Sequence, residues 1–414
     1  MKTNNNIPAY RFQGYTDAWK QRKLGEVATF AKGNGYSKKD LVIKGSPIIL
    51  YGRLYTKYET VISEVDTFVS VEDNNNSVVY SEGGEVLVPA SGESSLDIAR
   101  ASVVAKKGII LGGDINIIRL HSEIFPVFLA LTISNGKQQK GLSKRAQGKS
   151  VVHLHNSDLK KVDLDFPTLP EQEAIGSFFS DLDQLITLHQ RKLDTLKEQK
   201  KTYLKLLFPA KGQTKPALRF QGFEDDWKEV KLGEVVSISS GYTGDATLNN
   251  GKYKLTRIET ISEGKVDVSR TGFSNELPDE KYRLNFGDIL FSNINSLVHI
   301  GKVAIFNTME EVFHGINLLR LVPNKDLINP YFIYYQLVTE SKKNWSKAHA
   351  NQAVNQASIN QTSLSTQKIS ISSLPEQEAI GTFFQTLDQE LAQVEDKLAS
   401  LKEMKKTLLR KLFV

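Results

Sequence analysis

The chain has 414 residues, which is enough for two or three domains that each bury a core. Its 40% hydrophobic and 24% charged residues are typical of a soluble globular protein, and the absence of cysteine excludes disulfides and cysteine-ligated zinc. No run approaches 18 apolar residues, so we expect a cytoplasmic protein with no contact with a membrane. The net charge is +6, and residues 1–170 hold 22 basic and 17 acidic side chains, which is compatible with a polyanionic partner.

The chain is a tandem duplication. RFQGYTDAWKQRKLGEV (11–27) opens the first half, and RFQGFEDDWKEVKLGEV (219–235) opens the second. Three later segments of the first half have counterparts in the second: 83–91 with 286–294, 101–105 with 301–305, and 114–120 with 315–321. Pro126 and Pro330 then each begin a short apolar run that resembles a helix. Short β-branched runs broken by Gly, Asn, Asp and Ser predict an α+β domain in each half, with a twisted, mostly antiparallel β-core.

Each half ends in a long amphipathic segment that begins LPEQEAIG, at Leu169 and again at Leu374. Apolar residues alternate at spacings of four and three over five heptads, which is typical of a coiled coil. Thr168 and Ser373 are in position to cap these helices, with a glutamate three residues on. The predicted seam residues are Ile175, Phe179, Leu182, Ile186, Leu193 and Leu196 in the first helix, and Ile380, Phe384, Leu387, Leu391, Leu398 and Leu401 in the second. Lys200 and Lys405 also occupy seam positions, where we expect their stems to pack and their ammonium groups to reach water.

The order of the segments predicts how the two helices pair. The first helix leads away from the first domain, and the second starts at the second domain, so a pair of seams must run antiparallel. Both helices carry acids early and bases late, so antiparallel pairing places acidic ends beside basic ends. We predict target domains at 1–168 and 209–373, the latter opening with a linker at 209–223, and coiled-coil helices at 169–208 and 374–414.

Motifs for catalysis or metal binding are incomplete. SKRAQGKS (143–150) nearly matches a phosphate-binding loop, but Ser143 replaces the first glycine and no apolar strand precedes it. His153 and His155 would share one face of a strand without a third ligand, so we expect no metal site. No nucleophile–base arrangement recurs in both halves. The chain alone is therefore predicted to be non-catalytic, with no cofactor of its own.

A basic stretch without acids precedes each long helix, at 134–150 and 341–361. Lysine and arginine neutralise phosphates, while Asn, Gln and Arg hydrogen-bond to the edges of adenine and guanine. A solvated loop is the alternative for either stretch alone, but two stretches at equivalent positions favour binding. The candidate DNA contacts are Lys137, Lys140, Lys144, Arg145, Gln147 and Lys149 in the first half, and Lys342, Lys343, Lys347, Asn351, Gln352 and Asn355 in the second.

This pattern resembles the specificity (S) subunit of type I restriction–modification systems. The resemblance rests on WKxxKLGE (227–234), LPEQ at each helix start, KKxxLxxLF at the second helix end (405–413), and the duplicated layout of the whole chain. It implies that each domain reads half of a bipartite sequence in double-stranded DNA. It also implies that the helices space the half-sites and dock two methylation subunits, joined by restriction subunits. Those partners would carry S-adenosylmethionine, ATP and Mg²⁺. The sequence departs from the family where a Gly-rich turn, Gln147-Gly148-Lys149, becomes Gln352-Ala353-Val354.

The interiors of the two halves diverge, since residues 34–80 and 241–282 do not align. We infer two different half-sites. Further candidate contacts with bases or phosphates are Tyr51, Arg53 and Lys57 in the first domain, and Arg257, Arg283, Asn293 and Asn295 in the second. A surface or turn role fits each of these residues equally well. A coiled-coil scaffold whose domains bind protein or glycan remains the alternative function. An enzyme complete in itself is a third, and it predicts methylation or cleavage by the chain alone.

Overall fold

The computed structural model describes residue 8 and residues 10–71, 78–148, 151–244, 248–261, 264–353 and 356–413. They form two compact units, Met1–Arg191 with Glu395–Val414, and Lys192–Val394. The predicted domain limits fall at the ends of the long helices. The boundary between the two units instead crosses each long helix, at residues 191/192 and 394/395. Each unit therefore joins one globular domain to a part of both long helices, α5 (Leu169–Leu206) and α10 (Leu374–Leu412).

The first domain is built on a five-stranded sheet in the order β2-β11-β7-β9-β5, antiparallel except for the β5–β9 pair. Its strands are Ala28–Lys32, Ile115–Leu120, Val86–Pro89, Ser102–Val104 and Val61–Ile62 in that order. A second sheet has the order β10-β4-β6-β3, formed by Ile110–Leu111, Ser46–Ile49, Phe68–Val69 and Leu41–Val42. Two-stranded pairs join β1 (Lys20–Lys23) to β13 (Asp163–Phe166), and β8 (Ser91–Gly92) to β12 (Val152–His153). The short helices are α1 (Tyr51–Thr56), α2 (Pro126–Ser134), α3 (Gly136–Ser143) and α4 (Asn156–Leu159).

The second domain repeats the core of this plan with a four-stranded antiparallel sheet, β15-β22-β18-β20, which within the described residues has no strand corresponding to β5. Its strands are Val236–Ser240, Leu319–Pro323, Ile289–Phe291 and Val303–Ile305. Beside it lies the sheet β17-β16-β21, formed by Gly272–Ser274, Tyr253–Leu255 and Val312–Phe313. Further sheets join β14 (Lys228–Lys231) to β25 (Lys368–Ile371), and β19 (Ile294–Asn295) to β24 (Gln356–Ser358) and β23 (Asn351–Ala353). The short helices are α6 (Leu232–Val235), α7 (Pro330–Leu337), α8 (Glu340–His349) and α9 (Gln361–Ser365).

The matched sequence segments occupy matching strands. The three pairs supply β7 and β18, β9 and β20, and β11 and β22, and Pro126 and Pro330 begin α2 and α7. Differences concentrate in the side sheets. The segments that failed to align supply β3, β4 and β6 of the four-stranded sheet and β16 and β17 of the three-stranded sheet, while β10 and β21 come from outside these segments. The α+β class with a mostly antiparallel core is confirmed.

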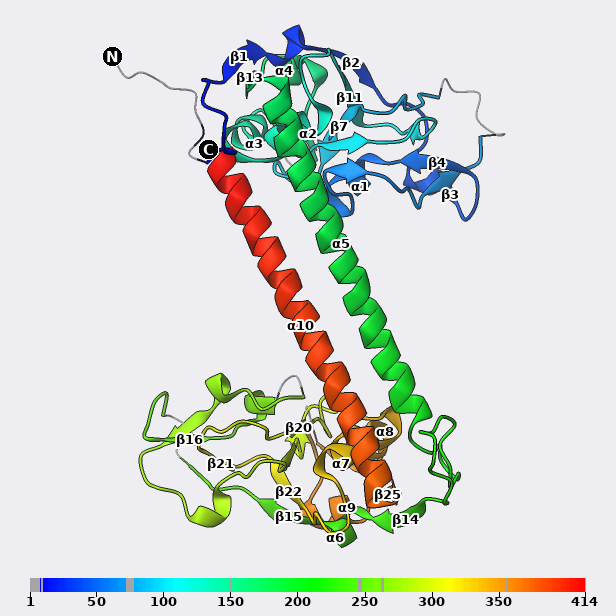
Figure 1. The fold of residues 1–414 in the computed structure, drawn as a ribbon, viewed down its shortest axis with the longest axis vertical. Helices are drawn as coiled ribbons and strands as arrows, with labels where there is room; N and C mark the ends of the chain where they lie inside the picture. The colour runs from blue at the N-terminus through cyan, green and yellow to red at the C-terminus, as the bar shows by residue number, and fades with distance from the viewer. Residues whose placement is uncertain are drawn as a thin grey trace. The chain divides into compact units, whose positions relative to one another are not determined.

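The antiparallel coiled coil is also confirmed, and in each unit the two helix segments lie side by side (Figure 1). In the first unit, Lys405 Nζ pairs with Asp183 Oδ1 and Lys402 Nζ donates to Gln190 Oε1 at 3.3 Å. In the second unit, Lys192 pairs with Glu390 at 2.8 Å. In these pairs the residue number rises along α5 as it falls along α10, so the helices run antiparallel. The twelve predicted seam residues are all buried.

The two seam lysines behave differently from the prediction. Lys200 Nζ lies 2.5 Å from Asp388 Oδ1, and Lys405 reaches Asp183, so both ammonium groups pair with a carboxylate while the lysine side chains stay partly exposed. Asp388 also accepts from the hydroxyl of Tyr335 at 2.9 Å, and Asp183 from that of Thr60 at 2.9 Å. The acidic start of one helix and the basic end of the other thus meet as ion pairs inside each unit.

The start of each long helix is fastened to the opener of its own domain. The Arg11 guanidinium donates to both carboxylate oxygens of Glu171 at 2.6 and 2.7 Å, and Arg219 does the same to Glu376 at 2.7 and 2.8 Å. These glutamates therefore anchor the openers to the helix starts. The neighbouring Gln172 accepts from the backbone N–H of Phe125 at 2.9 Å.

The end of each long helix completes an aromatic cluster. In the second unit Phe208 packs on Phe332, with ring centroids 5.4 Å apart, and Phe332 packs on Trp227. In the first unit Phe413 packs on Phe128, with ring centroids 6.0 Å apart. A Cβ on Gly136 would lie 1.3 Å from the Phe413 carbonyl oxygen, so only glycine permits this approach. Among the described residues, no helix has the length and apolar content needed to cross a bilayer.

Candidate nucleic-acid interface

A hairpin follows α3 in the first domain. The backbone N–H of Gln147 donates to His153 O at 3.1 Å, and that of His153 donates to Gln147 O at 2.8 Å. β12 continues this hairpin and pairs with β8, and His153 Nδ1 lies 3.0 Å from the hydroxyl of Ser91. The hairpin is therefore held by β8, the strand that directly follows β7 in the chain.

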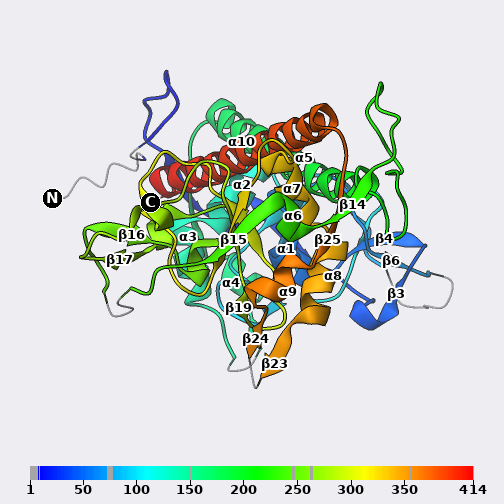
Figure 2. The ribbon, with the colours of Figure 1, turned by 90° about the horizontal axis from the view of Figure 1, so that it is seen from below.

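The second domain holds a hairpin at the same place. Gln352 pairs with Ala357 and Ala353 with Gln356 across β23 and β24, and β24 pairs in turn with β19. Figure 2 shows this small sheet extending from the second domain on the side away from α10. Gln147 and Gln352, which align in the two halves of the sequence, thus occupy equivalent hairpin strands.

The turns of the two hairpins differ, as their sequences suggested. Gly148 has φ +128°, and a Cβ there would lie 2.0 Å from the Val151 carbonyl oxygen, so this position requires glycine. Ala353 instead belongs to a regular ladder with Gln356. Lys149, Val354 and Asn355 lie outside the described residues. Contacts inferred for one hairpin therefore do not transfer directly to the other.

The exposed side chains of the hairpins are suited to reading bases. Gln147 is exposed in the first domain, and Asn351, Gln352 and Gln356 are exposed in the second. A primary amide both donates and accepts, which matches the N6 and N7 groups of adenine in the major groove. Lys144 and Lys347 are also exposed, close in sequence to their hairpins, where an ammonium group suits a phosphate.

Four other basic candidates pair with groups of the protein itself. Lys137 pairs with Asp165, and Arg145 Nη1 donates to Asp158 O at 3.1 Å. At the position equivalent to Lys137, the Lys342 ammonium donates to Lys368 O, and burial lowers the pKa of this amine. Lys343 pairs with Glu340 at 3.5 Å on the same helix. The basic stretch is thus divided between residues that hold α3 and α8 and residues that flank the hairpins.

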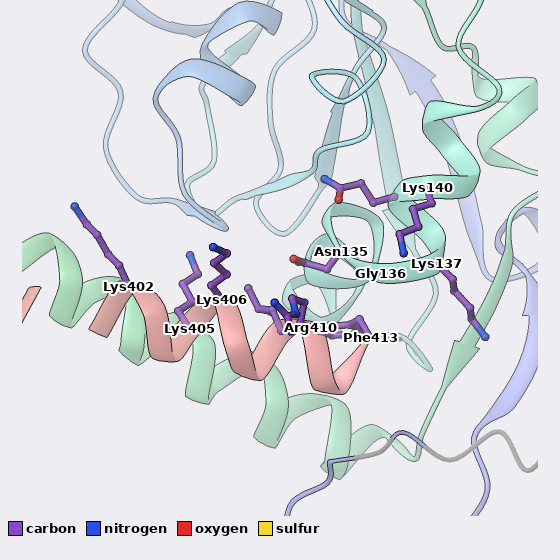
Figure 3. A pocket seen from close by; sticks show the side chains of 11 residues that line it. Asn135, Gly136, Lys137, Lys140, Lys402, Lys405, Lys406, Arg410 and Phe413 are labelled. Carbon is purple, nitrogen blue, oxygen red and sulfur yellow. The ribbon is translucent and has the colours of Figure 1, made fainter. Parts of the chain in front are cut away.

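A cationic cavity of about 700 Å³ lies between α3 and the last turns of α10 (Figure 3). Lys137 and Lys140 come from α3, while Lys405, Lys406 and Arg410 come from α10. Leu409 and Phe413 add apolar lining. Lys140 therefore belongs to this cavity, which the sequence did not predict because the cavity joins segments far apart in the chain.

Four of the further candidates pair with other groups. Arg53 and Lys57 both form ion pairs with Asp66, and Arg53 Nη2 lies 3.4 Å from Asp66 Oδ2. Arg257 Nη2 donates to Leu248 O at 3.2 Å, and Arg283 pairs with Glu280 and Glu311.

Two of the remaining candidates belong to the hairpin region. Asn295 lies in β19 opposite Ala357, and the Asn293 carbonyl accepts from the N–H of Ile359 at 2.8 Å. Tyr51 begins α1. Among the described residues, no group of three or more His, Cys, Asp or Glu side chains is arranged to hold a metal.

Comparisons with known proteins agree on one family. The family model described as the type I restriction modification DNA specificity domain matches residues 16–198 and again 224–403. A putative type I restriction enzyme MjaX specificity subunit of Methanocaldococcus jannaschii is 41% identical over 194 residues, and the match spans 46% of each chain, or about half the length of that relative. The MjaVIII specificity subunit of the same organism is 24% identical, with 89% of this chain and 86% of that one covered.

The fold has a solved counterpart. The crystal structure of a type I restriction–modification system S subunit from M. genitalium superposes with a TM-score of 0.63, covering 99% of both chains at 19% identity. At this identity the likeness concerns the fold alone. It extends over the duplicated domains and both long helices.

Proposed function

Because the chain belongs to the family of type I restriction–modification DNA specificity proteins, we propose that it is the sequence-recognition subunit of such a system. The observation that carries the proposal is the pair of exposed, amide-bearing hairpins at equivalent places in two duplicated domains. Each hairpin presents groups that hydrogen-bond to base edges, and each has an exposed lysine nearby in sequence. Two reading domains in one chain fit a bipartite target in double-stranded DNA.

The two halves of the target differ in this proposal. Gln147 follows Lys144 in one hairpin, while Asn351, Gln352 and Gln356 carry neutral amides in the other. The side sheets of the two domains also differ in strand number and order. Identical half-sites would not require these differences, so an asymmetric site accounts for them.

The helices α5 and α10 would hold the two domains at a set spacing and dock two methylation subunits, with restriction subunits completing the complex. S-adenosylmethionine, ATP and Mg²⁺ would belong to those partners, and the chain itself would be non-catalytic. This part of the proposal rests on family membership. The alternative of a scaffold that binds protein or glycan gains no support from the comparisons.

The test is selection of duplexes from a random library by the chain assembled with its methylation partner. We expect one bipartite sequence to be enriched, with an affinity that falls steeply as salt rises, because phosphate contacts release counterions. Mapping of methylated adenines in the source cell should return the same sequence. Enrichment of no sequence, or binding that salt does not change, would refute the proposal.

A further inference from the structure

A tight turn stands beside the hairpin in both domains. In the first, the backbone N–H and the hydroxyl of Ser94 donate to Asp97 Oδ2 at 2.9 and 2.7 Å, and the Asp97 N–H donates to Ser94 O at 3.2 Å. In the second, the Ser296 N–H donates to Asn295 Oδ1 at 2.8 Å, and the His299 N–H donates to Ser296 O at 2.9 Å. These bonds close both turns, so their side chains are presented on a constrained backbone.

Each turn exposes an aliphatic side chain two residues before a buried isoleucine, and the second turn also exposes Leu297, at 39%. Leu96 is 59% exposed and precedes the fully buried Ile98 by two residues. Val298 is 75% exposed and precedes the buried Ile300 by two residues. A single exposed aliphatic residue is ordinary on a protein surface. Two exposed aliphatic residues at one place in the two domains, where neither side chain adds to a core, indicate a shared use.

The strand registers place both turns toward the hairpin ends. Gly92 of β8 pairs antiparallel with Val152, so the chain beyond Gly92 advances in the direction of Val151. Asn295 of β19 pairs with Ala357, so the chain beyond it advances in the direction of Gln356. The aliphatic turn and the exposed hairpin residues therefore share one edge in each domain.

We propose that Leu96 and Val298 each contact the 5-methyl group of a thymine in the major groove, and so help to select the sequence. The inference deepens the proposed function and rests on it. The thymine methyl is the apolar group that base edges display in the major groove, on the same edge as the adenine groups that amides read. A hairpin amide and the neighbouring aliphatic side chain can therefore read one A·T pair together. Valine is too short for a wedge between base pairs, which favours the methyl contact in both domains.

The experiment uses the full chain with its methylation partner and the selected duplex. Each thymine is replaced singly by uracil, which lacks the methyl group. We expect one position in each half-site to lower affinity by about fourfold, since burial of one methyl-sized group is worth about 0.8 kcal/mol. Leu96→Ala should weaken binding by about tenfold and abolish the uracil effect in one half-site only, and Val298→Ala should do the same in the other.

Matched controls are Ile43→Ala in the first domain and Leu277→Ala in the second, since both side chains are exposed aliphatics, at 93% and 65%. Neither should change affinity, and all four variants should assemble normally with the partner. A uracil effect that survives both turn variants overturns the proposal, and so does weaker binding with no sensitive thymine. A wild-type complex that selects no duplex refutes the proposed function itself, which separates the two failures.

Discussion

The buried ion pair between Lys405 and Asp183 offers a test of how the helices are held in the first unit. The Asp183 side chain is only 9% exposed, and desolvation raises its pKa although Lys405 and the Thr60 hydroxyl favour the charged form. Lys405→Met keeps the apolar stem but leaves the carboxylate buried without its cation. Loss of one partner of a buried pair costs about 3–5 kcal/mol, and we expect about 3 kcal/mol because Lys405 retains partial exposure.

Urea unfolding of the full chain measures this loss. The matched control is Lys406→Met, one residue along the same helix, where an exposed lysine lies 3.8 Å from Glu403 and should contribute less than about 0.5 kcal/mol. The double variant Lys405→Met with Asp183→Leu removes both charges and should recover most of the lost stability. Without Lys405 the folded pKa of Asp183 rises further above its unfolded value, so the destabilisation should be complete at neutral pH and shrink as pH falls. Equal losses for the two lysines, or no recovery in the double variant, would refute this reasoning.

Three further predictions concern the second domain. Burial lowers the pKa of His314 to about 4 from 6.5, and since the unfolded histidine takes up its proton first, stability should fall by about 3 kcal/mol between pH 6.5 and pH 4. His314→Gln should flatten that part of the pH dependence of unfolding, and an unchanged profile would contradict the assignment. Arg219→Met leaves Glu376 buried and unpaired and should cost about 3 kcal/mol in thermal unfolding, against almost nothing for the exposed Lys215→Met. Gln352→Ala should weaken specific DNA binding about tenfold through one half-site with unchanged unfolding, whereas equal losses at both half-sites would exclude a base contact.

The framework of the fold was predictable because duplication reinforced local patterns. A run such as GGEVLVPAS (83–91) is an ambiguous strand by itself, but its counterpart at 286–294 is followed by the counterparts of the later segments in the same order. The first run forms β7, which pairs with β9, and the second forms β18, which pairs with β20. The heptads predicted the helices equally well, because an apolar seam that holds its register over five heptads is typical of long, paired helices.

Contacts between distant segments were not predictable in the same way. Arg11 and Glu171 lie 160 residues apart, and no local rule pairs them. A signal was present, because the opener and the LPEQ motif both recur, but recurrence alone does not say that one binds the other. Whether a basic residue is available to bind DNA also depends on a partner distant in the sequence. Lys137 pairs with Asp165, and Lys342 donates to the Lys368 carbonyl.

The placement of the anchors explains how the two domains diverged while the helices stayed alike. Arg219 and Glu376 fix the start of α10, and the cluster of Trp227, Phe332 and Phe208 fixes the end of α5. The hairpin of β23 and β24 is tied instead to β19, through backbone pairs that place few demands on side chains. Hairpin residues are therefore free to change without loosening the helices, and only a position such as Gly148, where the backbone itself requires glycine, resists exchange. Selection for a new target would act on this separable part first.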